Sequence, residues 1–134
     1  MGFGLMLERL LDSVILIDHF NGITPATRFL SSLNPDSTAI SVITLAEILV
    51  GLDKEAAGKA RLLLDQYQIL SIDPPVAEKA ALLRQRFGWK LPDAFQAALA
   101  LQHHIRLVTR NTKDFDPRKH SFVEIPYKDK GSVH

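Results

Sequence analysis

The chain alternates between short apolar runs and longer segments in which apolar residues recur every three or four positions. The short runs, bounded by turn-forming residues, predict β-strands at residues 7–11, 38–42, 68–72, 106–109 and 121–125. The longer segments predict helices at residues 14–20, 24–33, 44–52, 54–67, 74–88 and 92–103. Strands that alternate with helices are typical of a parallel sheet covered on both faces. We therefore expect one α/β domain over residues 1–127, with three α/β/α layers and a mainly parallel sheet of four to five strands, and a polar tail over residues 128–134.

Local signals mark the starts of two of these helices. Thr24 directly precedes Pro25, so we expect Thr24 to be the N-cap and the proline to be the first helical residue. Thr44 is followed three residues later by Glu47, which is the spacing of a capping box. This pattern predicts that a helix begins at Thr44.

Two histidines and the tryptophan are more readily explained by packing or surface exposure than by a role in ligand binding. His103 and His104 are adjacent, so on a helix their side chains diverge by about 100° and cannot share a metal ion. We expect His103 to pack along the helix and His104 to lie at the surface. Trp89 stands between two basic residues and could stack on a base, but a buried tryptophan is the favoured interpretation.

Composition narrows the function classes. The 134 residues, 46% hydrophobic and 23% charged, are typical of one globular domain. The absence of cysteine excludes disulfides, thiolate zinc sites and iron–sulfur clusters. No apolar run approaches the roughly 20 residues of a membrane span, and no basic segment opens a signal peptide. A cytoplasmic location is therefore expected.

Charge is divided unevenly along the chain. Residues 1–83 hold 6 basic and 10 acidic residues, a balance of −4, whereas residues 84–134 hold 10 basic and 5 acidic residues, a balance of +5. Such a division can place a basic surface beside an acidic pocket, as an enzyme acting on a polyanion requires. A chance distribution of solvated charges explains it equally well.

Four acidic residues stand at the ends of the predicted elements. Asp12 follows the first strand, Glu47 lies shortly after the second, Asp93 opens a helix, and Asp114 lies in the loop after the fourth strand. In parallel α/β sheets, ligands bind beyond the carboxyl ends of the strands. Carboxylates gathered there suit Mg²⁺ or Mn²⁺, and such an ion can promote hydrolysis of a phosphodiester.

Each acid also has a structural explanation. Asp12 could cap the following helix, Glu47 could complete the capping box, Asp93 lies where a helix dipole favours an acid, and Asp114 could be an ordinary loop residue. Asp18 is better explained as a helix end or an ion-pair partner than as a metal ligand. The joint placement of the four acids, rather than any single one, indicates a site.

With these acids placed, the chain resembles the PIN-domain ribonucleases, and more narrowly the VapC-type toxins of bacterial toxin–antitoxin pairs. Four segments that contain the acids carry the resemblance, in the order and spacing of that family: residues 10–18, 41–51, 91–98 and 107–115. The resemblance implies a PIN-like fold and a metal-dependent endoribonuclease that leaves a 5′-phosphate. It also implies a homodimer that is inhibited by a cognate antitoxin protein.

The resemblance also implies roles for individual residues. Asp12 and Asp93 would be the firmest ligands of Mg²⁺ or Mn²⁺, with Glu47 acting through water and Asp114 as the fourth acid. Thr109 and Asn111 would orient the attacking water or the phosphate. Arg110 and Lys113 would contact RNA phosphates. These expectations concern eight positions: Asp12, Glu47, Asp93, Thr109, Arg110, Asn111, Lys113 and Asp114.

Two positions depart from the family pattern. Val14 stands where relatives often have Asn or Ser, and Asn111 stands where many have Asp, so the fourth acidic role is assigned to Asp114. Two alternatives to a ribonuclease remain open. One is a PIN-like module that binds RNA or protein without catalysis. The other is a receiver-like signalling domain, which is disfavoured because Asp12 has no adjacent acid and the fifth strand is followed by Ile125-Pro126-Tyr127 where that domain needs a lysine.

Overall fold

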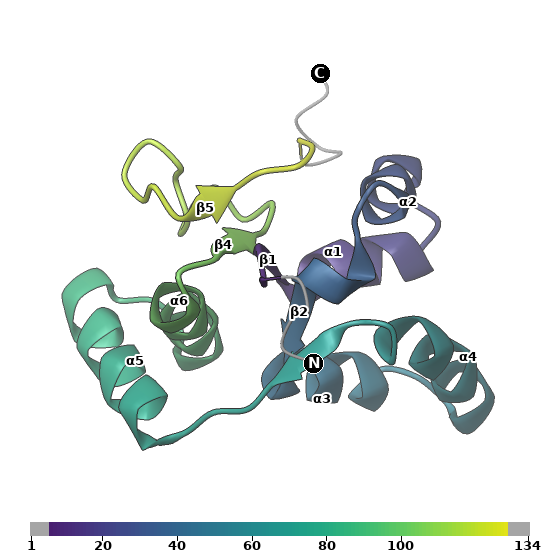
Figure 1. Ribbon diagram of the computed structural model, residues 1–134, viewed down its shortest axis with the longest axis horizontal. Coiled ribbons are helices and arrows are strands. Elements are labelled where there is room, and N and C mark those ends of the chain that lie inside the picture. The colour runs from purple at the N-terminus through teal and green to yellow at the C-terminus, as the bar shows by residue number, and fades with distance from the viewer. Residues whose placement is uncertain (1–5, 129–134) are drawn as a thin grey trace.

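Helices cover both faces of a five-stranded sheet in the computed structural model, which describes residues 6–128 (Figure 1). Every pairing in the sheet is parallel, and the strand order is β3-β2-β1-β4-β5. The strands are β1 (Arg9–Leu11), β2 (Thr38–Ser41), β3 (Gln68–Leu70), β4 (Arg106–Val108) and β5 (Val123–Glu124). The helices are α1 (Ser13–Phe20), α2 (Thr24–Ser31), the short 3-10 turn η1 (Pro35–Ser37), α3 (Val42–Val50), α4 (Lys54–Leu64), α5 (Pro74–Phe87) and α6 (Leu91–His103).

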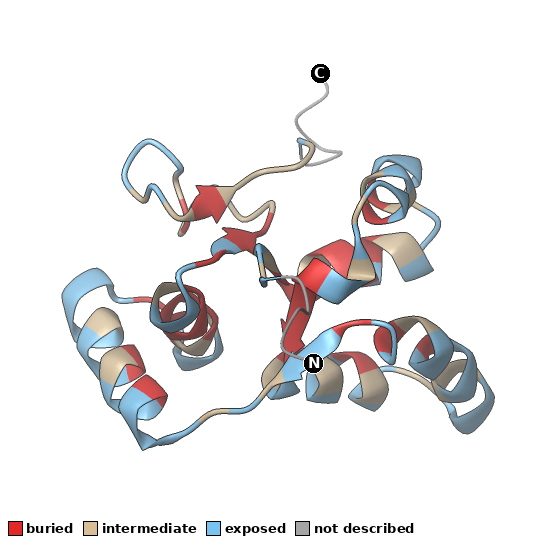
Figure 2. Ribbon diagram, viewed as in Figure 1, coloured by how far each residue is buried: buried red, intermediate tan, exposed pale blue. Residues whose placement is uncertain are grey.

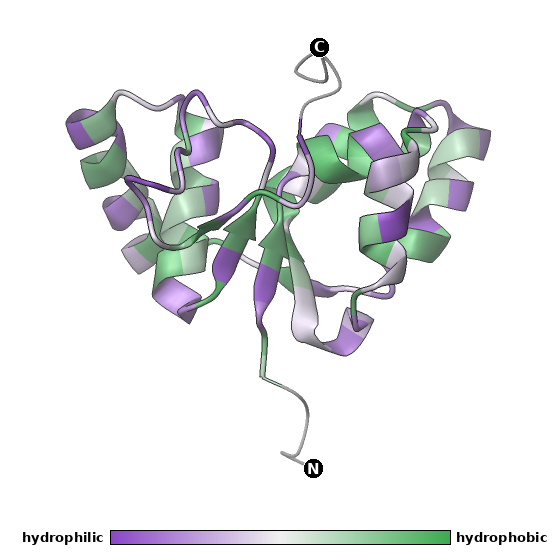
Figure 3. Cartoon of the chain, turned by 90° about the horizontal axis from the view of Figure 1, so that it is seen from above, coloured by the Kyte–Doolittle hydropathy of each residue, from purple (hydrophilic) through white to green (hydrophobic). Residues whose placement is uncertain are grey.

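The helices form two layers, one on each face of the sheet. Helices α1 to α4 lie on one side of the sheet, and α5 and α6 pack against each other on the opposite side (Figures 1 and 3). Strands β1, β2 and β4 between them are largely buried, whereas β3 at the edge is largely exposed (Figure 2), and Figure 3 shows hydrophobic residues along the strands. Leu10 and Leu11 of β1 are both fully buried and belong to different core clusters, one on each face. The α/β/α prediction with a parallel sheet is confirmed.

The strand order creates a switch point between β1 and β4. Chain connections leave β1 toward β2 on one side, and the connection from β3 returns to β4 on the other. The register pairs Leu11 at the end of β1 with Val108 at the end of β4. Loops that follow these two strands therefore diverge from one point, where ligands bind in open α/β sheets.

Two predicted N-caps are wrong. Helix α3 begins at Val42, and its N-cap is Ser41, whose hydroxyl accepts a hydrogen bond from the Thr44 N–H at 3.0 Å. Thr44 is thus the third residue of the helix and cannot open a capping box with Glu47. Helix α2 has Ile23 as its N-cap, without a side-chain cap, because Thr24 already has helical backbone geometry.

Some other details differ from the prediction. The helix predicted over 54–67 ends at Leu64. The strands are shorter than their apolar runs: only three positions pair between β2 and β3, and two between β4 and β5. His103 is exposed, so its predicted packing role is wrong, whereas His104 lies at the surface as expected. Helix α5 ends where predicted, at Gly88, which takes a left-handed φ of 73° that favours glycine. Of the predicted tail, residues 129–134 lie outside the described residues.

Candidate active site

Asp12 lies at the switch point, where its backbone and both of its carboxylate oxygens form hydrogen bonds. Its backbone N–H donates to the Val108 carbonyl at 2.9 Å, which ties the end of β1 to the end of β4. One carboxylate oxygen accepts from the Ser13 N–H at 2.8 Å and caps α1. The other accepts from the Thr109 hydroxyl at 2.8 Å. The side chain therefore has one fixed orientation, and its predicted capping role is confirmed.

The environment of Asp12 is unusual for a carboxylate because the residue is only 8% exposed. Burial raises the pKa of Asp12, and the hydrogen bonds from Thr109, Ser13 and Gln96 oppose that rise. Donors aimed at a buried carboxylate stabilise its ionised form. The site is thus arranged to keep a negative charge where water gives it little support.

Asp93 reports most directly that the four acids lie together. It stands in the first turn of α6, and its pKa is raised to about 6 by burial and then by the negative charges of Asp12, Asp114 and Glu47, against a smaller opposing effect of Lys90. These acids come from distant parts of the sequence, yet each is close enough to affect Asp93. The other three carboxylates thus contribute to the electrostatic environment of Asp93 and disfavour its ionisation.

Asp114 is positioned by a tightly hydrogen-bonded loop. The Asn111 side-chain amide donates to the Asp114 carboxylate at 3.0 Å, and the Asn111 side-chain oxygen accepts from the Asp114 N–H at 3.4 Å. The Asn111 N–H in turn donates to the Thr109 hydroxyl at 3.1 Å. In this structure Thr109 and Asn111 therefore position the acids: Thr109 donates to Asp12, and Asn111 donates to Asp114.

Trp89 is buried, as expected, and holds this loop in place through a hydrogen bond. Only 4% of the residue is exposed, and its indole N–H donates to the backbone carbonyl of Asp114 at 3.0 Å. The Arg84 guanidinium donates to the Trp89 carbonyl at 2.6 Å, which fixes the segment after α5. The loop that carries Asp114 is thereby tied to helix α5.

Glu47 differs from the other three acids because it is exposed on α3. Since Ser41 caps this helix, the Glu47 carboxylate has no capping duty. A solvent-facing side chain at this position can turn toward the other acids without losing a cap.

The sequence analysis missed Gln96, a buried amide on α6. Its amide nitrogen donates to the Thr44 hydroxyl at 2.7 Å, and it lies near enough to Asp12 to lower the pKa of that carboxyl. Its side-chain oxygen is buried and has no hydrogen-bond partner among residues 6–128. The available signal was one polar residue among alanines, one turn after Asp93 and therefore on the same helix face.

Arg110 does not point freely toward a substrate. Its guanidinium makes two hydrogen bonds to the Asp18 carboxylate, at 2.6 and 3.1 Å, and the Tyr127 hydroxyl donates to the same carboxylate at 2.9 Å. The ion-pair interpretation of Asp18 is confirmed. Arg110 thus joins the loop after β4 to α1, whereas Lys113 in the same loop is exposed.

The oxygen atoms of these side chains are suitable ligands for a hard divalent cation. Carboxylate oxygens are the preferred ligands of Mg²⁺ and Mn²⁺, and the unpartnered Gln96 oxygen adds a neutral acceptor nearby. Within the described part of the chain, however, no three acidic or histidine side chains are grouped as a preformed metal site. Metal binding by the four acids therefore requires some of their side chains to turn toward a common point.

Comparisons with known proteins agree with this arrangement. The family described as PIN domain matches residues 9–118. The chain is similar to a solved toxin–antitoxin complex from Klebsiella pneumoniae, with 39% identity, a TM-score of 0.83, and coverage of 91% of this chain and 100% of that chain. It is also similar to FitAcB from Neisseria gonorrhoeae, with 26% identity, a TM-score of 0.73, and coverage of 88% and 97%.

A third structure shares the fold at lower identity. It is VapBC2 from Rickettsia felis bound to a DNA fragment from the promoter, with 21% identity, a TM-score of 0.72, and coverage of 88% of this chain and 98% of that chain. A search of the curated proteins gives no match. Between residues 6 and 128, no helix has the length and apolar character needed to span a bilayer.

Proposed function

This chain belongs to the PIN-domain family, and we propose that it is the toxin of a toxin–antitoxin pair, acting in the cytoplasm as an endoribonuclease that depends on Mg²⁺ or Mn²⁺. Membership of this nuclease family indicates a hydrolase that acts on nucleic acid. RNA as the substrate and the identity of the metal are the further steps of the proposal. A receiver-like domain is set aside because the PIN family matches residues 9–118, which contain strands β1 to β4.

The observation that carries the proposal is the electrostatic coupling at Asp93. Burial, and then the negative charges of Asp12, Asp114 and Glu47, raise the pKa of Asp93 to about 6. A cluster of like charges disfavours ionisation of its members, and the capping of α1 by Asp12 does not require the other three acids. A divalent cation bound among the acids offsets that cost, so the cluster is best explained as a metal site.

In the proposed mechanism, Asp12, Asp93, Glu47 and Asp114 would hold the metal ion. A bound Mg²⁺ or Mn²⁺ polarises the phosphodiester, activates water and stabilises the leaving oxygen. Thr109 and Ser13 orient the Asp12 carboxylate through hydrogen bonds that favour its ionised form. Asn111 orients the Asp114 carboxylate, and exposed Glu47 is free to orient the attacking water. Lys113, which is exposed in the same loop as Asp114, would meet a phosphate of the substrate.

We further propose that a cognate antitoxin protein is the partner of this chain and that the chain forms a homodimer. The support for the antitoxin is that the structure from Klebsiella pneumoniae is a toxin–antitoxin complex and resembles this chain over nearly its whole length. The homodimer is carried over from the family resemblance alone. Gel filtration with light scattering, with and without the protein encoded beside this chain, tests both.

The test of the nuclease is cleavage of a total RNA pool by the purified protein in Mn²⁺ or in EDTA. We expect cleavage in Mn²⁺ only, and its loss in Asp12→Asn, because the variant keeps the shape of the cap but removes a central charge. Asp36→Asn is the matched control, since Asp36 is an exposed acid in the turn before β2. A wild-type protein that binds RNA without cutting it would favour the non-catalytic PIN-like module instead.

A further inference from the structure

A cavity of about 510 Å³ opens beside Asp114, outside the cluster of acids. It lies between the C-terminal end of α5 and the loop from Lys113 to His120. Its volume falls within the range of about 300–1,000 Å³ that is usual for ligand pockets. Its walls combine rings and charges: Arg86, Phe87, Lys113, Asp114, Lys119 and His120. We propose that this cavity is a subsite for one nucleotide of a single-stranded RNA substrate, next to the phosphodiester that is cut; this inference rests on the proposed function.

The aromatic wall is suited to a base. Phe87 stacks on Trp89 with ring centroids 4.6 Å apart and an interplanar angle of 20°, and His120 meets both rings at 5.0 and 5.1 Å. Trp89 is buried, whereas Phe87 is 39% exposed and has the Arg86 guanidinium carbon over its ring, 5.1 Å from the centroid. Rings arranged in this way bind bases by stacking, with little dependence on sequence.

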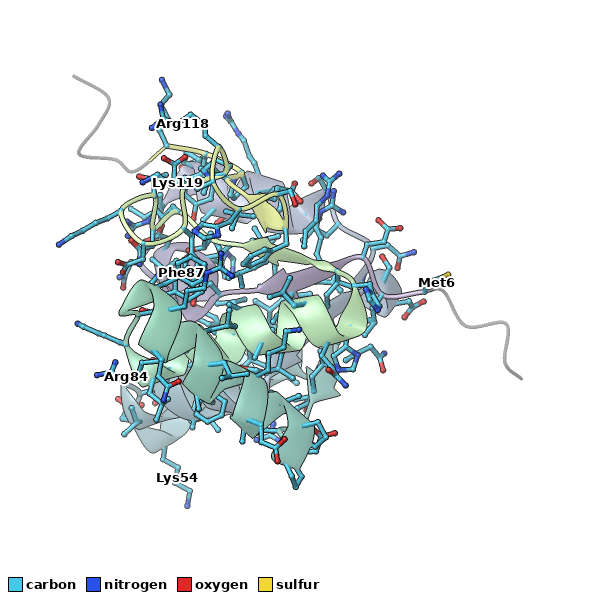
Figure 4. All side chains as sticks on the ribbon, turned by 90° about the vertical axis from the view of Figure 1, so that its left-hand side faces the viewer. Met6, Lys54, Arg84, Phe87, Arg118 and Lys119 are labelled. Atoms are coloured by element: carbon cyan, nitrogen blue, oxygen red, sulfur yellow. The ribbon has the colours of Figure 1, made fainter. Side chains whose placement is uncertain are left out.

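The charges around the rings suit a phosphate. Arg86, Lys113 and Lys119 are all exposed at the cavity, and within residues 6–128 no ion pair joins any of them to a carboxylate. Two acids line the same cavity: Asp114, which belongs to the acidic cluster, and Asp116, which is already paired with Arg118 at 2.9 Å. Figure 4 shows Phe87 facing the loop that carries Lys119 and Arg118.

The cavity is continuous with the candidate active site through Asp114. The same residue lines the cavity, contributes to the raised pKa of Asp93, and accepts the Trp89 indole hydrogen bond through its backbone carbonyl. The ring stack and the acids are therefore held in a fixed relation. A strand whose phosphate lies at the acids places its neighbouring nucleotide within reach of the rings.

The test uses the fluorescence of Trp89, which is the only tryptophan of the chain. A single-stranded hexaribonucleotide of mixed sequence is titrated into the full-length protein in EDTA, so that binding is measured without cleavage. We expect saturable quenching. Phe87→Leu, which keeps apolar volume but removes the ring, should weaken binding about fivefold or more. Lys119→Ala should weaken binding and lower the salt dependence, by about 0.7 in the slope of log K against log salt.

Controls separate a specific subsite from general attraction. Lys54→Ala removes an exposed charge on α4, far from the cavity in Figure 4, and should bind as the wild type does. An oligomer of the same length without bases should bind more weakly than the RNA. Equal affinity for the two oligomers, or unchanged affinity in both Phe87→Leu and Lys119→Ala, would overturn the inference. Lys119 is exposed in a loop, so this second variant remains informative if Phe87→Leu fails to fold.

The outcome can be distinguished from that of the proposed function. If the wild type cuts RNA in Mn²⁺ but the cavity variants bind RNA normally, the nuclease stands and the subsite is wrong. If the variants lose binding although the wild type cuts no RNA, the subsite stands and the nuclease is wrong.

Discussion

Asp93 is the residue at which the cost of burying a carboxylate among other acids can be measured. Its pKa is 3.8 in the unfolded chain and about 6 in the fold, so the ionised side chain destabilises the folded state. That cost is fully present above pH 6 and vanishes below the unfolded value. Asp93→Asn should therefore raise the free energy of unfolding near neutral pH in EDTA, by about 1 kcal/mol once solvent screening of a half-buried group is allowed for.

Urea denaturation at two pH values tests this prediction. Near neutral pH the variant should be more stable than the wild type, and the gain should disappear as the pH falls to about 4. Asp36→Asn, in an exposed turn, should show no such pH-dependent gain. A variant as stable as the wild type at both pH values would mean that the acids do not repel one another in the folded protein.

For individual residues, the sequence predicts the positions of the acids better than it predicts hydrogen-bond and ion-pair partners. Four acids can be located from their place after strands and at helix starts, because position along the chain determines which end of the sheet they reach. The partners cannot be located in this way. Arg110 pairs with Asp18, 92 positions away, and Gln96 donates to Thr44, 52 positions away. Such contacts depend on how layers pack, which no local pattern encodes.

Helix α3 shows how a local signal can suggest the wrong element boundary. The Thr44–Glu47 spacing predicts a capping box, but Ser41 provides the cap three residues earlier. Two variants separate these interpretations. Ser41→Ala should lower the free energy of unfolding by about 1 kcal/mol, because it removes the acceptor of a buried N–H. Glu47→Ala should leave that free energy within about 0.5 kcal/mol of the wild type.

Thermal and urea denaturation of the two variants, together with RNA cleavage, completes the comparison. If Glu47 serves the metal site, Glu47→Ala should lose cleavage while keeping its stability. A Glu47→Ala protein as destabilised as Ser41→Ala would restore the capping role, which the geometry of α3 contradicts.

The whole molecule depends on a strand order that the sequence does not reveal. Alternating strands and helices predict a parallel sheet, but several strand orders satisfy that pattern. The observed order places β1 beside β4, and only then does the Asp12 carboxylate meet the Thr109 hydroxyl. The active-site geometry is thus a property of the topology, whereas the residue types are a property of the sequence.

Metal binding at that switch point should stabilise the entire domain. Any ligand that binds only the folded state raises the free energy of unfolding, by about 2.7 kcal/mol when its concentration is 100 times the dissociation constant. For a chain of 134 residues this corresponds to a rise in Tm of several degrees, on the order of 5–10 °C. We expect that rise for the wild type in Mn²⁺ or Mg²⁺, and its reversal by EDTA.

The decisive comparison is between variants that differ in one charge. Asp12→Asn and Asp93→Asn should lose most of the metal-induced rise, because each removes a carboxylate from the shared electrostatic environment. Asp36→Asn should keep it, because its acid lies outside that environment. Scanning calorimetry in EDTA and in Mn²⁺ measures all four proteins on one scale. An equal rise in every protein would place the metal elsewhere and leave the repulsion at Asp93 without a counter-ion.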